Sequence, residues 1–120
     1  MSLLEKLLRN WPRLPQITAD DLQGRLHSAL PPLLLDVRTP LEYAAGHISG
    51  AINIPHEQVL ARVAELIAHK DRDIIIYCRS GMRASQAARA LQQHGFVRLA
   101  FLSGHMQGWH ANGRPVHRHH

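Results

Sequence analysis

A strand, a tight loop and a helix follow one another in residues 74–91, and this succession restricts the fold more than any other part of the chain. Residues 74–77 (IIIY) are β-branched and aromatic, which predicts a buried strand. Residues 79–81 (RSG) form a small polar turn, and residues 84–91 contain many strong helix formers. The pattern therefore places Cys78 at the carboxyl end of a strand, facing the loop that leads into a helix.

Cys78 is the only cysteine of the chain. A lone cysteine is often a small buried hydrophobe. That interpretation suits a position inside the strand better than one between a tyrosine and an arginine, before a glycine turn. Unpaired N–H groups of the loop, the dipole of the following helix and the charges of Arg79 and Arg83 all favour the thiolate. The position therefore predicts a functional thiol.

The composition limits both the compartment and the partners. The 120 residues are enough for one domain with its own core, and a single cysteine excludes an internal disulfide. Charged residues interrupt the apolar N-terminus, so we expect no signal peptide and a reducing, cytoplasmic location. Fourteen basic and nine acidic side chains give 14 − 9 = +5, but the basic ones are scattered. We therefore expect an anionic small molecule or an acidic protein as partner, and no nucleic acid.

The N-terminus is predicted to be a helical extension spanning residues 1–15. Residues 3–11 place leucines and a tryptophan on one helical face, and Pro12 and Pro15 end the segment. Such a face packs either on its own domain or on a second copy, which leaves a monomer or a homodimer open. The alternative is docking on a membrane surface or a partner. Few positive charges occur here, so no membrane contact is expected.

Strands and helices alternate along the rest of the chain. Strands are predicted at residues 16–17, 33–37, 51–54, 74–77 and 96–102. Helices are predicted after the capping residues Thr18 and Thr39, and at residues 57–69, 84–94 and 103–109. This alternation favours an α/β fold with a mainly parallel central sheet and helices on both faces. Ligands bind at the carboxyl ends of such strands, where Asp36 and Cys78 both lie.

Three segments resemble the signatures of one known family. Residues 34–38 (LLDVR) precede a series of matching positions at 42–43, 46–48, 50–51 and 53–55. Residues 77–84 (YCRSGMRA) are similar to an active-site loop, and residues 104–109 (GHMQGW) to a closing segment, with Ser103 where a glycine is common. Together they resemble a single-domain rhodanese, a sulfurtransferase, and indicate a rhodanese domain at residues 16–116.

The resemblance implies a chemistry for Cys78. Its thiolate would attack the outer sulfur of thiosulfate or a similar donor, sulfite would leave, and a persulfide would remain on Cys78. A thiophilic acceptor, either cyanide or a thiol that an acceptor protein can carry, would then take the sulfur. These two half-reactions imply ping-pong kinetics and need no cofactor.

The same resemblance implies which residues hold the substrate. Backbone N–H groups would bind the anionic sulfur, and the residues that carry them are Arg79, Ser80, Gly81, Met82 and Arg83. The side chains of Arg79 and Arg83 either bind the sulfonate end of the donor or are solvated. Asp36, Arg38 and Glu42 resemble active-site charges, but we expect them to support the site by tying the strand end to neighbouring loops.

Histidines are not expected to take part in the chemistry. His47 is interpreted as a hydrogen-bonded loop residue rather than a base. The sequence places no second histidine or carboxylate beside Cys78, and a preformed thiolate needs no general base. His117, His119 and His120 are metal-ligand types, but residues 117–120 are predicted to be a flexible tail, so we expect no metal site.

Two other functions remain open at this point. Cysteine phosphatases and arsenate reductases also use a thiolate in an anion-binding loop, with the spacing Cys-x5-Arg. The spacing from Cys78 to Arg83 is Cys-x4-Arg, which suits a sulfur atom better than a phosphoryl group, and no aspartic acid is identifiable as a leaving-group acid. The second alternative is a carrier or binding module that passes sulfur to a protein partner.

Overall fold

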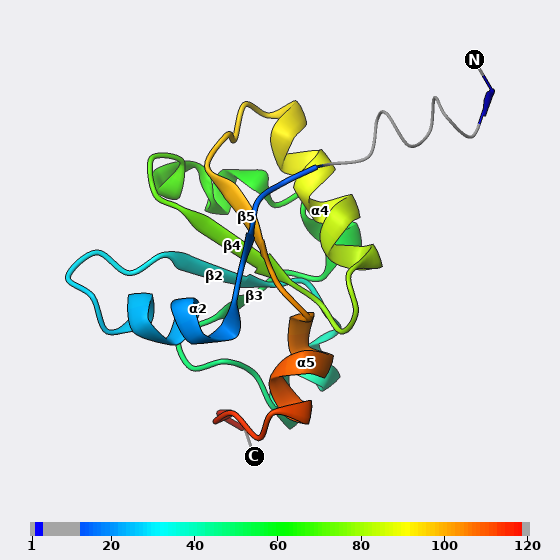
Figure 1. Cartoon of the computed structure of the whole chain (residues 1–120). Helices are drawn as coiled ribbons and strands as arrows, with labels where there is room; N and C mark the ends of the chain where they lie inside the picture. The colour runs from blue at the N-terminus through cyan, green and yellow to red at the C-terminus, as the bar shows by residue number, and fades with distance from the viewer. Residues whose placement is uncertain (1, 4–12, 119–120) are drawn as a thin grey trace.

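The computed structural model describes residues 2–3 and 13–118, and a five-stranded sheet forms its centre (Figure 1). The strand order is β1-β5-β4-β2-β3, and all neighbouring strands are parallel. The strands are β1 (Gln16–Ile17), β2 (Leu33–Asp36), β3 (Ile52–Asn53), β4 (Ile74–Tyr77) and β5 (Leu99–Leu102). The predicted parallel sheet is therefore confirmed.

Helices cover both faces of this sheet, as the sequence predicts (Figure 1). They are α2 (Ala19–Leu26), α3 (Pro40–Ala45), α4 (Met82–Gln93) and α5 (His105–Ala111). Successive side chains of a strand point to opposite faces. Ile74 and Ile76 accordingly share a core cluster with α4, whereas Ile75 and Tyr77 pack in a second cluster with α2 and α5. Both clusters consist mainly of side chains that are almost fully buried.

Local capping signals in the sequence set several helix ends. The Thr18 side chain accepts a hydrogen bond from the backbone of Asp21 at the start of α2. Thr39 and Glu42 form a reciprocal capping box at the start of α3. At the end of α4, Gly95 adopts a positive φ of 80°, which glycine does at little cost.

The continuous helix predicted for residues 57–69 is wrong. The segment consists of three short 3₁₀ turns, η1 (His56–Gln58), η2 (Val63–Glu65) and η3 (Ile67–His69), joined by further turns. Only Val59 and Leu66 are fully buried in it. Two other apolar side chains, Leu60 and Ile67, are 52% and 57% exposed. The apolar spacing therefore does not correspond to one buried helical face.

Several predicted boundaries also move. Strand β5 begins at Leu99 rather than at residue 96, although Phe96 is buried in the core. Within the predicted tail at 117–120, His117 pairs with His47 in an antiparallel bridge of two hydrogen bonds of 2.8 and 2.9 Å. Residues 119–120, and all but Leu3 of the predicted helix at 3–11, lie outside the described residues. No helix in the described part of the chain is long and apolar enough to span a bilayer.

The register brings the ends of three strands to one edge. Asp36 stands opposite Tyr77 of β4 on one side and opposite Asn53 of β3 on the other. Cys78 follows Tyr77 directly, and β5 ends beside β4. Cys78 therefore lies at the edge of the sheet from which the loops after β2, β3 and β5 also leave.

Candidate functional site

Cys78 lies where β4 meets the loop into α4. Its side chain packs in the core cluster beneath α4 and only 1% of the residue is exposed. The Gly81 N–H donates a hydrogen bond to Cys78 Sγ, with a distance of 3.0 Å between nitrogen and sulfur. The loop therefore turns back on the thiol and presents a hydrogen-bond donor to it.

Gly81 has a backbone conformation that this turn requires. Its φ is 131°, which L-residues with a side chain rarely adopt. The next two residues, Met82 and Arg83, begin α4, and the N–H groups of a first helical turn have no intrahelical acceptor. In the described residues no other acceptor takes these two N–H groups either. The start of α4 therefore offers free donors and the positive end of a helix dipole beside the sulfur.

The carbonyl groups of the loop are bound by a second helix. The backbone N–H of Met106 donates to the carbonyl of Cys78 at 2.9 Å, and that of Gln107 donates to the carbonyl of Arg79 at 3.0 Å. Both donors belong to the first turn of α5. These contacts fix the peptide planes of the loop, because the carbonyls are held on α5 while the Gly81 N–H reaches the sulfur.

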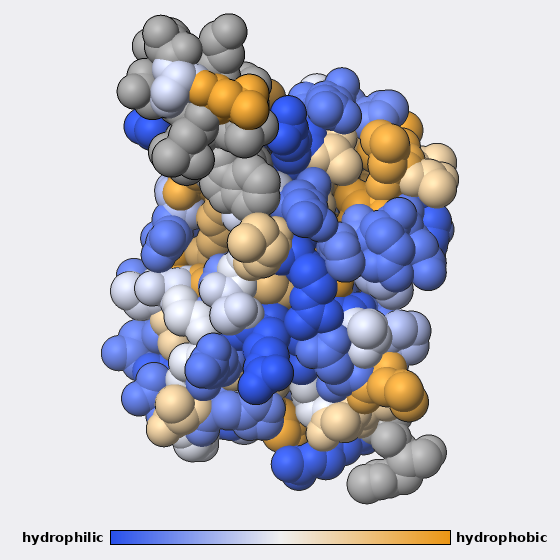
Figure 2. All heavy atoms as spheres, turned by 90° about the vertical axis from the view of Figure 1, so that its right-hand side faces the viewer, coloured by the Kyte–Doolittle hydropathy of each residue, from blue (hydrophilic) through white to orange (hydrophobic). Residues whose placement is uncertain are grey.

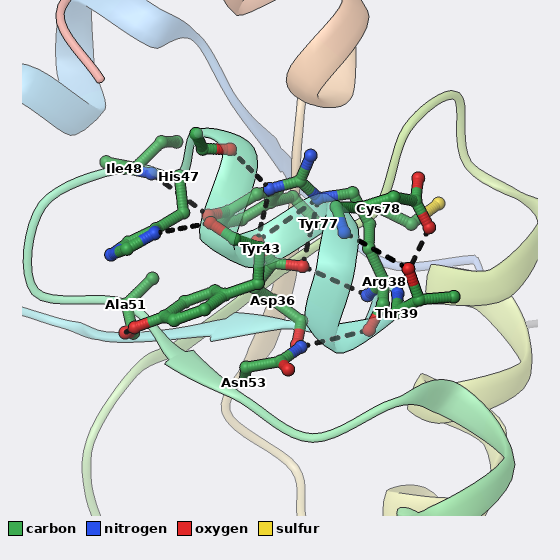
Figure 3. Close-up of polar contacts among 12 residues, drawn as sticks. Asp36, Arg38, Thr39, Tyr43, His47, Ile48, Ala51, Asn53, Tyr77 and Cys78 are labelled. Carbon is green, nitrogen blue, oxygen red and sulfur yellow. Dashed lines mark hydrogen bonds and ion pairs between the residues drawn. The ribbon is translucent and has the colours of Figure 1, made fainter. Parts of the chain in front are cut away.

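Asp36 and Arg38 form a buried ion pair behind the loop (Figure 3). Arg38 Nη2 donates to Asp36 Oδ2 at 2.7 Å and to the carbonyl of Gly46 at 2.8 Å. The side chain of Asn53 donates to the carbonyls of both Asp36 and Arg38. The pair thus connects the end of β2 to the end of α3 and to β3, which is a supporting arrangement.

Arg83 makes a second ion pair, with Glu42 of α3. Its Nη1 and Nη2 donate to the two carboxylate oxygens at 2.6 and 3.0 Å. These hydrogen bonds hold the pKa of Glu42 well below its ordinary value, at about 2. The Arg83 side chain is therefore engaged within the protein, which the sequence, with the two residues 41 positions apart, does not indicate.

The Arg79 side chain differs from that of Arg83. Arg79 and Ser80 are exposed, and Met82 is 64% exposed. No hydrogen bond or ion pair between described residues holds the Arg79 guanidinium. It lines a hollow of about 400 Å³ together with Arg38, Glu42, Ala45, Gly46, Met106, Gln107 and His110. This is the arrangement of a cation available to an anionic ligand.

A histidine that sequence reasoning missed also adjoins the loop. His105, at the start of α5, accepts a hydrogen bond at Nδ1 from the backbone N–H of Cys78, at 3.2 Å. The sequence alone does not place this histidine beside Cys78, because the two residues are 27 positions apart. Parallel topology carried the missing signal, because β4 and β5 end at one edge and His105 follows β5 by three residues.

His47 has the role that its sequence context predicts. It is buried, its Nδ1 lies 2.8 Å from the carbonyl of Tyr43, and its ring stacks on the Tyr43 ring. It holds the loop after α3, where Figure 3 shows it directed toward Tyr43.

Comparison with known proteins identifies the family of this chain. The model of the rhodanese-like domain family matches residues 18–112. Since this match covers most of the chain, the protein belongs to the rhodanese-like domain family. The family and the sulfurtransferases among its relatives support a sulfurtransferase activity.

Individual relatives are similar over most of their length. A sulfurtransferase of Allochromatium vinosum is 40% identical over 101 residues, which are 84% of this chain and 92% of the relative. The thiosulfate sulfurtransferase PspE of Escherichia coli is 34% identical over 58% of this chain and 67% of its own. The crystal structure of a rhodanese-related protein from Thermoplasma volcanium has a TM-score of 0.74 at 30% identity, covering 86% of this chain and 97% of that one.

Proposed function

We propose that the protein transfers sulfane sulfur from thiosulfate, or a similar anionic donor, to cyanide or a thiol through a persulfide on Cys78. The observation that carries the proposal is the hydrogen bond from the Gly81 N–H to Cys78 Sγ. A donor at 3.0 Å stabilises an anionic sulfur. The free N–H groups that follow it at the start of α4 offer further donors to the same anion. The Gly81 N–H suits the charge on Sγ of the thiolate before transfer, and the free N–H groups of Met82 and Arg83 suit the charge on the outer sulfur of the persulfide after it.

Each half-reaction exchanges one sulfur bond. The Cys78 thiolate attacks the outer sulfur of thiosulfate, the sulfur–sulfur bond of the donor breaks, and sulfite leaves with the electron pair. Cyanide or a thiolate then attacks the outer sulfur of the persulfide, and Cys78 is released as a thiolate. No proton transfer is needed when both nucleophiles are anionic. The mechanism therefore requires no general base.

Arg79 supports the choice of an anionic donor. Its exposed guanidinium is free of partners in the described part of the structure, and a guanidinium binds sulfonate-type oxygens through charge-assisted hydrogen bonds. Figure 2 shows that hydrophilic side chains predominate on the face that lies to the right in Figure 1, with apolar ones in separate spots. Such a face suits a small charged donor or a hydrophilic acceptor protein. The single reduced cysteine fits a cytoplasmic location, which we include in the proposal.

A phosphatase is the main competing enzyme, and two observations count against it. The loop from Cys78 to Arg83 has one residue fewer than a phosphatase loop. The Arg83 side chain, which a phosphatase would direct at phosphate, is bound to Glu42 instead. The proposal therefore keeps Arg83 as a structural residue.

Substitution of the thiol tests the proposal. Cys78→Ser and Cys78→Ala are expected to form no thiocyanate from thiosulfate and cyanide while keeping the circular dichroism spectrum of the wild type. Appreciable turnover by either variant would overturn the mechanism. The wild type is expected not to hydrolyse aryl phosphates, and phosphatase turnover comparable to its sulfur transfer would favour the competing enzyme.

A further inference from the structure

His105 has an unusual backbone and a specific contact with the active-site loop. It is the one non-glycine residue of the described chain with a positive φ, at 52°. Its Nδ1 accepts the hydrogen bond from the backbone N–H of Cys78, 27 positions earlier in the sequence. Because Nδ1 is the acceptor, a neutral imidazole here carries its proton on Nε2.

The other nitrogen of the ring faces the opposite end of the same loop. A Cβ atom placed on Gly81 would lie 3.2 Å from His105 Nε2. Gly81 is the residue whose N–H donates to Cys78 Sγ. One imidazole therefore contacts the residue that carries the sulfur and lies next to the residue that donates to it.

We propose that His105 is a positioning residue whose neutral, Nε2-protonated form holds the Cys78 loop in its reactive geometry, and whose protonation releases it. Protonation would put a hydrogen on Nδ1, so that two donors would face each other across the 3.2 Å contact with the Cys78 N–H. The hydrogen bond would then be lost. The role in sulfur transfer rests on the proposed function, whereas the effect on Cys78 reactivity does not.

The surroundings of the ring favour the neutral form. Burial lowers the pKa of His105 below its ordinary value of about 6.5. The ring lines a hollow of about 530 Å³, to which the segment before β1 contributes the cation Arg13. The residues that α4 and β5 contribute, Met82, Ser85 and Phe101, carry no charge. No acidic side chain lines this hollow, so among the described residues only a thiolate on Cys78, whose backbone N–H the ring contacts, would favour the imidazolium.

Protonation of His105 has two opposite effects on the reactivity of Cys78. An imidazolium beside Cys78 would favour the thiolate and raise the reactivity of the sulfur at low pH. Loss of the hydrogen bond would lower it. The proposal states that the second effect is larger, so reactivity at Cys78 falls as His105 becomes protonated.

Two variants separate the hydrogen-bond acceptor that His105 provides for the Cys78 N–H from the protonation of its ring. In His105→Asn, the side-chain oxygen can accept from the Cys78 N–H, the residue tolerates a positive φ and the side chain does not titrate. His105→Gly tolerates the same φ but removes the acceptor. Thermal unfolding of both variants checks that each remains folded. If His105→Gly does not fold, the comparison of the wild type with His105→Asn alone decides the proposal.

The measurement is the rate of Cys78 alkylation by iodoacetamide between about pH 5 and 8, alongside kcat/KM for thiosulfate. We expect the ratio of wild type to His105→Asn to be constant near pH 8 and to fall about five- to tenfold toward pH 5, the size of one neutral hydrogen bond. His105→Gly should be slower than His105→Asn by a similar factor at every pH. A ratio that stays constant or rises toward pH 5 would overturn the proposal.

Nitrogen NMR of the His105 ring provides a readout without any reaction. We expect the spectrum at neutral pH to show a protonated Nε2 and an unprotonated Nδ1. A protonated Nδ1 at neutral pH would contradict the proposal. If alkylation and NMR agree with it but thiosulfate gives no turnover, the proposed function fails and the positioning role of His105 stands.

Discussion

At the scale of single residues, Arg79 and Arg83 lie five positions or fewer from Cys78 but differ in what holds their side chains. Arg83 is bound to Glu42 by two hydrogen bonds, whereas Arg79 is exposed at a hollow beside the loop. A side chain that already has a partner within the protein contributes less to an incoming anion. The two arginines are therefore expected to give separate effects on kinetics and on stability.

Arg79→Ala is expected to lower kcat/KM for thiosulfate about ten- to a hundredfold, the range of one charge-assisted hydrogen bond. The second half-reaction with a neutral acceptor should change much less. Arg79→Lys, which keeps the charge but not the guanidinium, is the matched control and should lose less activity than Arg79→Ala. Steady-state kinetics of both half-reactions provide the measurement, and an unchanged kcat/KM in Arg79→Ala would show that the side chain is a solvated bystander.

The difference between the two arginines also shows where sequence reasoning ends at this scale. The strand-loop-helix pattern places Cys78 correctly, because a buried strand, a polar turn and a helix are each encoded by adjacent residues. The partner of Arg83 is 41 positions away, and the histidine beside Cys78 is 27 positions away. Such contacts depend on which strand ends meet at one edge of the sheet, and this is a property of the topology.

At the scale of elements, the site depends on connections between helices rather than on any one of them. The first turn of α5 holds the carbonyls of the Cys78 loop, and the Glu42–Arg83 pair connects α3 to α4. Capping signals predict the starts of α2 and α3 because they are local. The failed prediction at residues 57–69 shows the limit of periodicity, since apolar spacing alone does not distinguish a helix from successive 3₁₀ turns.

The connection between α3 and α4 is expected to make stability depend on pH. The pKa of Glu42 is lowered to about 2, so its folded value lies below its ordinary value of about 4.3. The ion pair therefore contributes fully above about pH 4.5, and its contribution is lost as the pH falls toward 2. Because the pair is partly exposed, we expect Glu42→Gln to cost roughly 1–2 kcal/mol at pH 7.

Urea unfolding of the wild type and Glu42→Gln at several pH values measures this contribution. The difference between the two proteins should shrink as the pH falls below about 4.5. Glu65→Gln is a suitable control, because Glu65 forms a solvent-exposed pair with Arg62 and should have little effect at any pH. A difference for Glu42→Gln that does not change with pH would show that the ion pair does not cause it.

At the scale of the whole molecule, two core clusters on opposite faces of one parallel sheet hold the strand ends in place. The alternation of apolar runs and helical segments is enough to predict this architecture, since the central strands β2 and β4 are buried on both faces. The buried pair of Asp36 and Arg38 is visible in the sequence only as two charges at a strand end. Its function as a connection among β2, α3 and β3 depends on the packed structure.

Asp36→Ala is expected to destabilise the whole fold by about 3–5 kcal/mol, because it leaves Arg38 charged and buried without its partner. The double variant Asp36→Ala/Arg38→Met removes both charges and should recover a large part of that loss. The free energy of unfolding of the single and double variants, measured in urea, shows whether the lost stability comes from the unpaired charge of Arg38. If the single and double variants are equally unstable, packing of Asp36 rather than its charge supports the site.

The measurement that tests the account most directly is the intact mass of the protein after treatment with thiosulfate. The wild type is expected to gain one sulfur atom and to lose it when cyanide is added, with formation of thiocyanate. Cys78→Ser, the matched control, should gain nothing under the same conditions. A wild type that acquires no sulfur, or a Cys78→Ser variant that acquires the same mass, would contradict a persulfide on Cys78.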